Sequence, residues 1–169
     1  MKHVLIPTDF TIASLQTVHA AMVQFPNEPI RISLLHLLEM PTGIGDLLMR
    51  AVRKDPNHLI TADFQKACEI IKNKYGHKIA QMDVLFRYGN TKNYVQNLLE
   101  GLNVDAIVLD PEVKLSLPHN ASVKMTPLLR KSGYHIIEMA PALKAKSLER
   151  ISFGSLLLKE MPESALSGA

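Results

Sequence analysis

Short apolar runs alternate with longer amphipathic stretches along this chain. Five runs have the length of strands and are rich in Val, Ile and Leu: residues 3–6, 30–38, 81–87, 104–109 and 133–139. Four stretches between them place apolar residues at the spacing of one helical face: residues 11–25, 58–75, 91–102 and 121–131. This alternation predicts an α/β fold, a three-layer α/β/α doubly wound sheet of five parallel strands with right-handed crossovers.

The first of these units, residues 2–15, shows the pattern most clearly. Its apolar run ends at Pro7, which has no N–H group for a sheet ladder. Thr8, Asp9 and Thr11 follow, and their side-chain oxygens can accept hydrogen bonds from the free N–H groups of the next helix. Since open parallel sheets bind ligands at the carboxyl ends of their strands, we expect any ligand at this turn.

Two segments fall outside the alternation of strands and helices. Residues 40–57 form a long connection that contains proline and glycine, with a short helix expected at 46–53. Such an insertion either covers a site or packs on the domain. Residues 1–140 are predicted to form the domain, and residues 141–169 a C-terminal extension that is partly packed at a dimer interface or disordered.

Composition narrows the classes of protein. A length of 169 residues and a hydrophobic content of 47% suit one domain with a full core. Cys68 is the single cysteine, so no intrachain disulfide can form and a reducing cytoplasm is expected. No uninterrupted apolar run reaches the roughly 20 residues that span a bilayer. We therefore expect a soluble protein with no membrane partner.

The charges do not indicate nucleic-acid binding. The chain has 19 basic and 16 acidic residues, which gives a net charge of +3, and they are spread along the sequence. Aromatic residues make up 5% and tryptophan is absent, so platforms for stacking bases are few. The densest basic run, residues 144–150, is interpreted as a solvated segment.

Several motifs, in their order and spacing, resemble the universal stress protein family. The motifs are HVLIPTDFTIASL at 3–15, LLHLLE at 34–39, RYGNTKNYV at 87–95, GLNVDAIVLD at 101–110 and, less closely, ASVKMTPLLRKSGYHIIEM at 121–139. The resemblance covers residues 2–139. It implies strand order 3-2-1-4-5, the adenine nucleotide alpha hydrolase-like fold, a homodimer, and a role in stress response without an established enzymatic reaction.

The resemblance also implies where a nucleotide would sit. Some members of the family bind ATP through the Asp after the first strand and a residue of the second strand, which correspond here to Asp9 and Leu37. In those members a loop of the form Gly-x2-Gly-x9-Gly-Ser/Thr after the fourth strand holds the phosphates. If a nucleotide binds this chain, its contacts are expected from Thr8, Asp9, Leu37, Asp110 and Ser122.

This chain departs from the family at the phosphate loop. Asp110, Val113 and Ala121 stand roughly where the glycines would be, and only Ser122 matches. A phosphate cradle needs glycine because backbone N–H groups must approach the oxygens closely, often with φ > 0. We therefore expect no cofactor, while ATP or AMP binding remains the alternative.

Other candidate sites have simpler explanations. Asp9 either contacts a ligand or caps the following helix. Asp9 and Asp110 would end adjacent strands, so a shared proton or divalent cation is an alternative, but we assign no metal site. The seven histidines lack the spacing of metal ligands; His36 is interpreted as a core imidazole, His119 as exposed, and Cys68 as a small hydrophobe.

Two main hypotheses for function remain. No Gly-x-Ser-x-Gly elbow or Walker loop occurs, so catalysis is not expected. The first hypothesis is a non-catalytic homodimer that acts in stress response through contacts with an unidentified regulatory protein, with its interface at the edge strand predicted at 133–139. The alternative is a small-molecule sensor with ATP, AMP or another ligand at the switch point between strands one and four. A metal-dependent enzyme at Asp9 and Asp110 would require a retained divalent ion.

Overall fold

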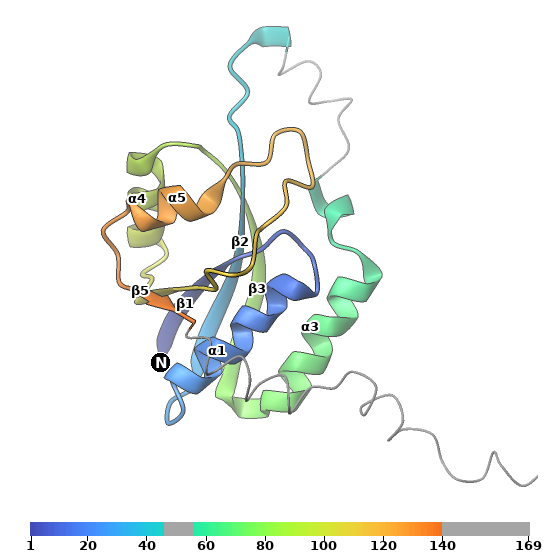
Figure 1. Ribbon diagram of the computed structural model, residues 1–169, viewed down its shortest axis with the longest axis vertical. Coiled ribbons are helices and arrows are strands. Elements are labelled where there is room, and N and C mark those ends of the chain that lie inside the picture. Colours follow the sequence, from blue (N-terminus) through green and yellow to red (C-terminus); the bar gives the residue numbers. More distant parts are fainter. Residues whose placement is uncertain (46–55, 140–169) are drawn as a thin grey trace, which may run out of the picture. The chain divides into compact units, whose positions relative to one another are not determined.

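Five parallel strands form a single sheet in the order β3-β2-β1-β4-β5 (Figure 1). The computed structural model describes residues 1–45 and 56–139. The strands are β1 (Lys2–Pro7), β2 (Ile30–Leu38), β3 (Ile79–Tyr88), β4 (Ala106–Leu109) and β5 (Ile136–Glu138). The helices are α1 (Gln16–Gln24), α3 (Ala62–Tyr75), α4 (Lys92–Gly101) and α5 (Met125–Arg130). The helix predicted at 46–53 and the extension predicted at 141–169 lie outside the described residues.

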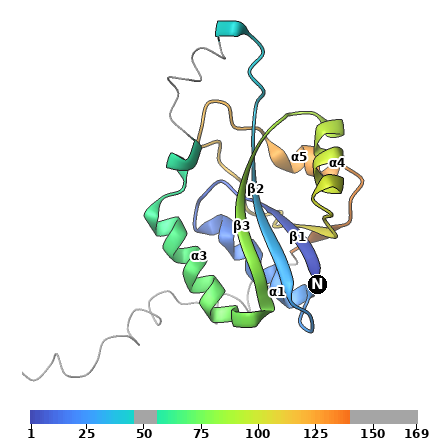
Figure 2. The ribbon, with the colours of Figure 1, turned by 180° about the vertical axis from the view of Figure 1, so that it is seen from behind.

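Helices α1 and α3 cover one face of the sheet, and α4 and α5 cover the other (Figures 1 and 2). The predicted three-layer α/β/α architecture and the strand order 3-2-1-4-5 are therefore confirmed, and all four strand pairs are parallel. From β1 the chain adds β2 and β3 on one side of the sheet, and it then crosses to the other side of β1 to add β4 and β5. The strand order therefore reverses between β1 and β4. In open α/β sheets, this switch point is where ligands bind.

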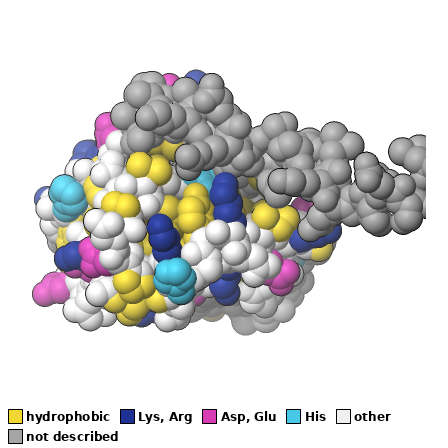
Figure 3. Space-filling view, turned by 90° about the horizontal axis from the view of Figure 1, so that it is seen from below, with side chains coloured by type: hydrophobic (Ala, Val, Ile, Leu, Met, Phe, Trp, Pro, Cys, Tyr) yellow, Lys and Arg dark blue, Asp and Glu magenta, His cyan; other side chains and the backbone are white. Residues whose placement is uncertain are grey.

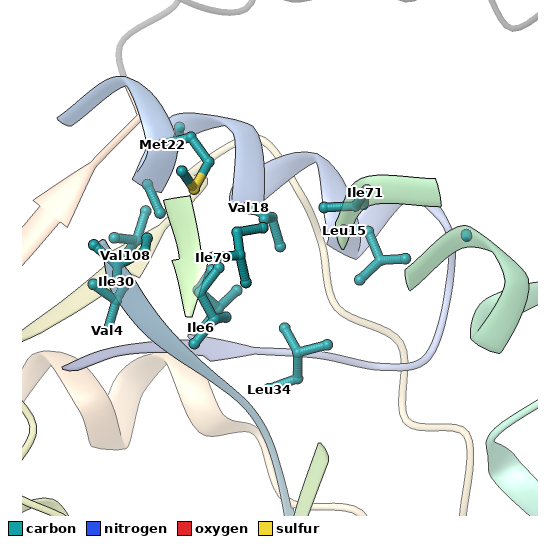
Figure 4. Close-up of a cluster of buried hydrophobic side chains, with 14 of the residues drawn as sticks. Val4, Ile6, Leu15, Val18, Met22, Ile30, Leu34, Ile71, Ile79 and Val108 are labelled. Atoms are coloured by element: carbon teal, nitrogen blue, oxygen red, sulfur yellow. The ribbon is translucent and has the colours of Figure 1, made fainter. Parts of the chain in front are cut away.

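Two clusters of buried apolar side chains hold the layers together. Successive side chains of a strand point to opposite faces, so Val4 and Ile6 of β1 join the cluster under α1 and α3, and Leu5 joins the cluster under α4 and α5. Figure 4 shows the first cluster, in which Leu15 and Val18 meet the strand residues. The central strand β2 is buried on both faces, which explains its continuous apolar sequence.

Threonines define where α3 and α4 begin. The Thr61 and Thr91 hydroxyl oxygens each accept a hydrogen bond at 3.2 Å, from the N–H groups of Phe64 and Tyr94. The helix predicted from residue 58 therefore begins at Ala62, after a 3-10 turn at Pro56–Leu59. The helix predicted from residue 11 likewise begins with a 3-10 turn, at Ala13–Leu15.

The helix predicted over residues 121–131 was wrong in its first turn. Helix α5 spans only Met125–Arg130, and Ser122 instead forms an antiparallel bridge with Leu38 of β2. Backbone hydrogen bonds to the end of β2 hold residues 121–123 extended, and these outweigh helical spacing. Pro127 lies in the first turn of α5, where a missing N–H group costs little.

Two strands are shorter than predicted. Only Ala106–Leu109 of the run at 104–109, and only Ile136–Glu138 of the run at 133–139, pair in the sheet. The strand predicted at 81–87 is longer, at Ile79–Tyr88, because it pairs along the whole of β2. The two edges of the sheet thus differ in length, with a long β3 and a short β5.

The surface carries charges of both signs. On the face drawn in Figure 3, Lys and Arg side chains lie among Asp, Glu and hydrophobic side chains. None of the helices within residues 1–45 and 56–139 has the length and apolar character needed to cross a membrane.

A glycine after β3 allows α4 to pack closely. A Cβ atom on Gly89 would overlap the ring of Tyr94, which lies in the first turn of α4. Gly101, the last residue of α4, has open space at the same position. Packing therefore requires glycine at residue 89 but not at residue 101, so the same substitution at the two positions can be compared.

We expect Gly89→Ala to lower the free energy of unfolding by roughly 1–3 kcal/mol, because the Tyr94 ring and its helix must shift. Gly101→Ala should leave it unchanged or raise it by about 0.5–1 kcal/mol, since alanine is the better helix former. Urea unfolding of the two variants and the wild type measures both values. Equal stability of the two variants would contradict this packing role for Gly89.

Candidate functional site

The loop after β4 folds back over the turn after β1. Residues 110–122 leave the carboxyl end of β4 and return across the switch point, where a ligand would be expected. Two sets of hydrogen bonds fix this loop, one at Asp9 and one at His36. Together they determine whether the switch point is open.

The Asp9 carboxylate is fully occupied by groups of its own chain. Its Oδ1 atom accepts hydrogen bonds from the Thr11 N–H at 3.1 Å and from the Thr11 hydroxyl at 2.6 Å. Its Oδ2 atom accepts from both the N–H and the hydroxyl of Ser116, each at 2.8 Å. A carboxylate offers about four acceptor positions. Asp9, which is only 5% exposed, therefore has none left for a ligand.

This pattern corrects the interpretation of Asp9 as a helix cap. The first helical turn, Ala13–Leu15, has no side-chain cap at Ile12, and Asp9 binds the turn before it. Burial alone would raise the pKa of Asp9, but the hydrogen bonds from Thr11 and Ser116 outweigh burial and hold the pKa below its usual value. Asp9 is thus a charged clamp that joins the loop after β4 to the turn after β1.

His36 of β2 makes the second link and is fully buried. Its Nδ1 atom lies 2.7 Å from the Thr8 carbonyl oxygen, which can only accept, so Nδ1 carries the proton. Its Nε2 atom then accepts from the Ser122 hydroxyl at 2.9 Å, and the Ser122 oxygen accepts from the His119 N–H at 3.1 Å. Burial is the main cause that lowers the pKa of His36. The interpretation of His36 as a core imidazole is confirmed.

Residues 121–123 extend along β2 beyond the end of β1. The Thr8 N–H donates to the Leu35 carbonyl, and two residues further along β2 the Val123 N–H donates to the Leu37 carbonyl at 3.0 Å. The Glu39 N–H donates to the Ala121 carbonyl at 2.7 Å. The loop therefore takes the place that a longer β1 would have, between β2 and the end of β4.

The predicted site residues separate into two groups. Thr8 and Ser122 meet at His36, and Asp9 meets the loop at Ser116. Leu37 is fully buried in the cluster under α4 and α5, and its carbonyl is taken by Val123. Asp110 accepts a hydrogen bond from the Glu112 N–H at 2.9 Å within its own loop.

Sequence reasoning missed Ser116 as a site residue. A serine in an irregular loop carries no periodic or motif signal, so only the path of the loop reveals its role. Ser122 could be predicted as a site residue, because it matches the Ser/Thr position of the phosphate loop in universal stress proteins.

A small cavity lies at the switch point among the residues that the structure describes. A cavity lined by Pro7, Leu109, Asp110 and Thr126, among others, measures about 10 Å³. That volume holds one water molecule, whereas small-molecule sites usually measure about 300–1,000 Å³. Within the described parts of the chain, no three His, Cys, Asp or Glu side chains gather as metal ligands would.

Comparison with known proteins supports the fold. No protein-family model matches the sequence, and no curated protein matches it either. The hypothetical protein PH0823 is similar in structure, with a TM-score of 0.50 and 19% identity over 82% of this chain and 94% of that chain. The universal stress protein UspA from Lactobacillus plantarum has a TM-score of 0.49 and 14% identity over 82% and 97%. A universal stress protein in complex with cAMP has a TM-score of 0.46 and 16% identity over 82% and 97%.

The similarity to PH0823 shows a shared fold. An identity of 19% transfers no residue role to this chain. The predicted three-layer fold with strand order 3-2-1-4-5 is thereby confirmed for residues 1–45 and 56–139.

We expect Asp9→Asn to lower the free energy of unfolding by about 2–3 kcal/mol, because the amide nitrogen cannot accept from Thr11 or Ser116 and the hydrogen bonds to a charged acceptor are lost. Asp110→Asn is the matched control at the end of the neighbouring strand. It should lower the free energy of unfolding by less, because an asparagine oxygen can still accept from the Glu112 N–H. Urea unfolding at neutral pH measures both. Equal losses would contradict the clamp at Asp9.

The same clamp predicts a dependence on pH. The pKa of folded Asp9 lies below the unfolded value of about 3.9, so its stabilisation is complete above that value and is lost as pH falls through the folded pKa. The stability difference between wild type and Asp9→Asn should be constant between about pH 5 and 7 and shrink at lower pH. Unfolding curves across this range measure it, and a difference that grows on acidification would refute the assignment.

Proposed function

We propose that this chain is a universal-stress-like, non-catalytic protein that acts through protein contacts and binds no nucleotide at its switch point. The observation that carries the proposal is the closure of this point by the chain itself. All acceptor positions of Asp9 are used, and residues 121–123 occupy the edge of β2 where a ligand would lie. A nucleotide would have to displace these contacts.

The loop is also unsuited to phosphates. Pro111 and Pro118 remove two backbone donors, and no glycine lies between residues 101 and 133. Asp110 and Glu112 add negative charge where phosphates would arrive, and repulsion between like charges disfavours their approach. Both features support a protein that uses its outer surface instead of this crevice.

The remaining parts of the proposal rest on the resemblance and on Cys68. A role in stress response, a homodimer and an unidentified regulatory protein partner follow from the family resemblance. The Cys68 thiol is half-buried, and burial is the main cause that raises its pKa to about 11. A thiol with so high a pKa is protonated at neutral pH and is a poor nucleophile, which supports a non-catalytic role.

Calorimetric titration with ATP, AMP and cAMP, with and without Mg²⁺, tests the absence of nucleotide binding. We expect no binding heat from the wild type, after a check that no nucleotide has been carried through purification. Micromolar binding that is abolished in Asp9→Asn would overturn the proposal in favour of a small-molecule sensor.

Hydrogen exchange tests the closure independently of any ligand. We expect the amides of Ser116 and Val123 to exchange slowly, because both donate to buried acceptors across the switch point. The amide of Lys114, an exposed residue of the same loop, serves as the internal control. Rapid exchange at both amides would mean that the loop is open in solution.

A further inference from the structure

Three histidines from three separate elements meet around the loop after β4. His36 lies in β2, His119 lies in the loop, and His58 lies in the 3-10 turn Pro56–Leu59 before α3. The ring centroids of His58 and His119 are 6.4 Å apart, and in Figure 1 the loop passes beside the turn that precedes α3. Histidine is the side chain that exchanges a proton between about pH 5 and 8, so the state of this cluster can depend on pH.

The closed loop requires an unprotonated nitrogen on His119. Its Nδ1 atom accepts a hydrogen bond from the Ala121 N–H at 3.0 Å, and its backbone N–H donates to the Ser122 hydroxyl oxygen at 3.1 Å. A proton on Nδ1 would place two N–H groups against each other, because both ring nitrogens of an imidazolium ion are donors. The ring of His119 must therefore be neutral, with its proton on Nε2.

The closed loop requires the opposite tautomer at His36. Its Nδ1 atom donates to the Thr8 carbonyl at 2.7 Å, and its Nε2 atom accepts from the Ser122 hydroxyl at 2.9 Å. A second proton on Nε2 would compete with the Ser122 O–H for the same position. Since His36 is fully buried, its charged form is favoured only after the segment that covers it has moved away.

The groups around His36 act on its charge in both directions. Asp9 and His119 are the charged or titratable groups that face this ring, and the uncharged rings of Phe10 and Phe86 pack against it. Burial is the main cause that lowers the pKa of His36, and His119 lowers it further, whereas a backbone hydrogen bond and the charge of Asp9 raise it. The folded pKa lies below the unfolded value of about 6.5, so this stabilisation is complete above that value and is lost as pH falls toward the folded pKa.

We infer that proton uptake by His119 and His36 releases residues 121–123 from β2 in mild acid, while the loop stays attached at Asp9. His58 assists the release, because two charged imidazoles at the His58–His119 contact repel each other. The link at Asp9 persists to lower pH, because the pKa of this carboxyl is held below its usual value. The end of β2 is therefore covered at neutral pH and exposed in mild acid.

This inference rests on the closure that carries the proposed function, since an open loop would have nothing to release. The two proposals fail in different ways. Rapid exchange of the Ser116 and Val123 amides at about pH 7.5 would refute the closure itself. Slow exchange at about pH 7.5 that stays equally slow at about pH 5.5 would refute only the release by protons.

Hydrogen exchange on the full chain, with each rate divided by the intrinsic rate at that pH, measures the release. We expect protection of the Val123 and Glu39 amides, which bond residues 121–123 to β2, to fall about tenfold to hundredfold between about pH 7.5 and about pH 5.5. The reason is that each of the two histidines favours the open form about tenfold one pH unit below the ordinary histidine pKa of about 6.5. The Ser116 amide, which is bound to Asp9, should keep its protection. Unchanged protection at Val123 and Glu39, or an equal fall at Ser116, overturns the inference.

A pair of histidine variants tests whether His119 takes up one of the protons. His119→Asn removes the titratable ring but keeps an acceptor, because an asparagine oxygen can accept from the N–H two residues later. The fall in protection at Val123 should then be about tenfold smaller than in the wild type. His77→Asn removes an exposed histidine from the 3-10 turn Gly76–Lys78 and should behave like the wild type. A fall in His119→Asn as large as in the wild type, or one equally reduced in His77→Asn, refutes the inference.

Nitrogen-15 NMR of the histidine rings adds a test that needs no variant. At about pH 7.5 we expect His36 as the Nδ1–H tautomer and His119 as the Nε2–H tautomer, as their hydrogen bonds require. On acidification both rings should take up protons over the range in which the Val123 amide loses protection. A proton on Nδ1 of His119 at neutral pH would overturn the inference.

Discussion

A single buried imidazole determines the form of the carboxyl end of this sheet. His36 joins three segments that are distant in sequence, because its two ring nitrogens reach Thr8 after β1 and Ser122 before α5 while its own strand is β2. Both bonds are satisfied by one neutral tautomer in a fully buried position. Hydrogen bonds in such surroundings are strong, and leaving them unmade is costly. The path of the loop over the switch point follows from this arrangement.

The Asp9 carboxylate complements the imidazole with a charge. It lies next to Thr8 in sequence and binds Ser116, six residues before Ser122, so the loop is held at two points by two chemically different groups. One link is neutral and the other is anionic. The loop between β4 and α5 thereby becomes part of the core architecture, although it contains neither strand nor helix over most of its length.

The strands and their order could be predicted because they depend on local periodicity and on a few breakers. The 9 residues of β2 agree with the prediction residue by residue, since a central parallel strand is apolar on both faces. Residues 121–123 could not be predicted, because their helical spacing is overridden by hydrogen bonds to β2, which lies more than 80 residues earlier in the chain. Ser116 was missed for the same reason: its role depends on where the loop travels. The absence of glycine in that loop was visible in the sequence, but the way the chain fills the space was not.

The placement of residues 121–123 has a consequence for mass action. A protein with an open crevice gains stability in proportion to the logarithm of the dissolved ligand concentration. Here the occupant of the crevice is tethered to the same chain, so its effective concentration is constant and dilution cannot remove it. Filling of the crevice is therefore one step of folding. The closed form is held by contacts within the chain.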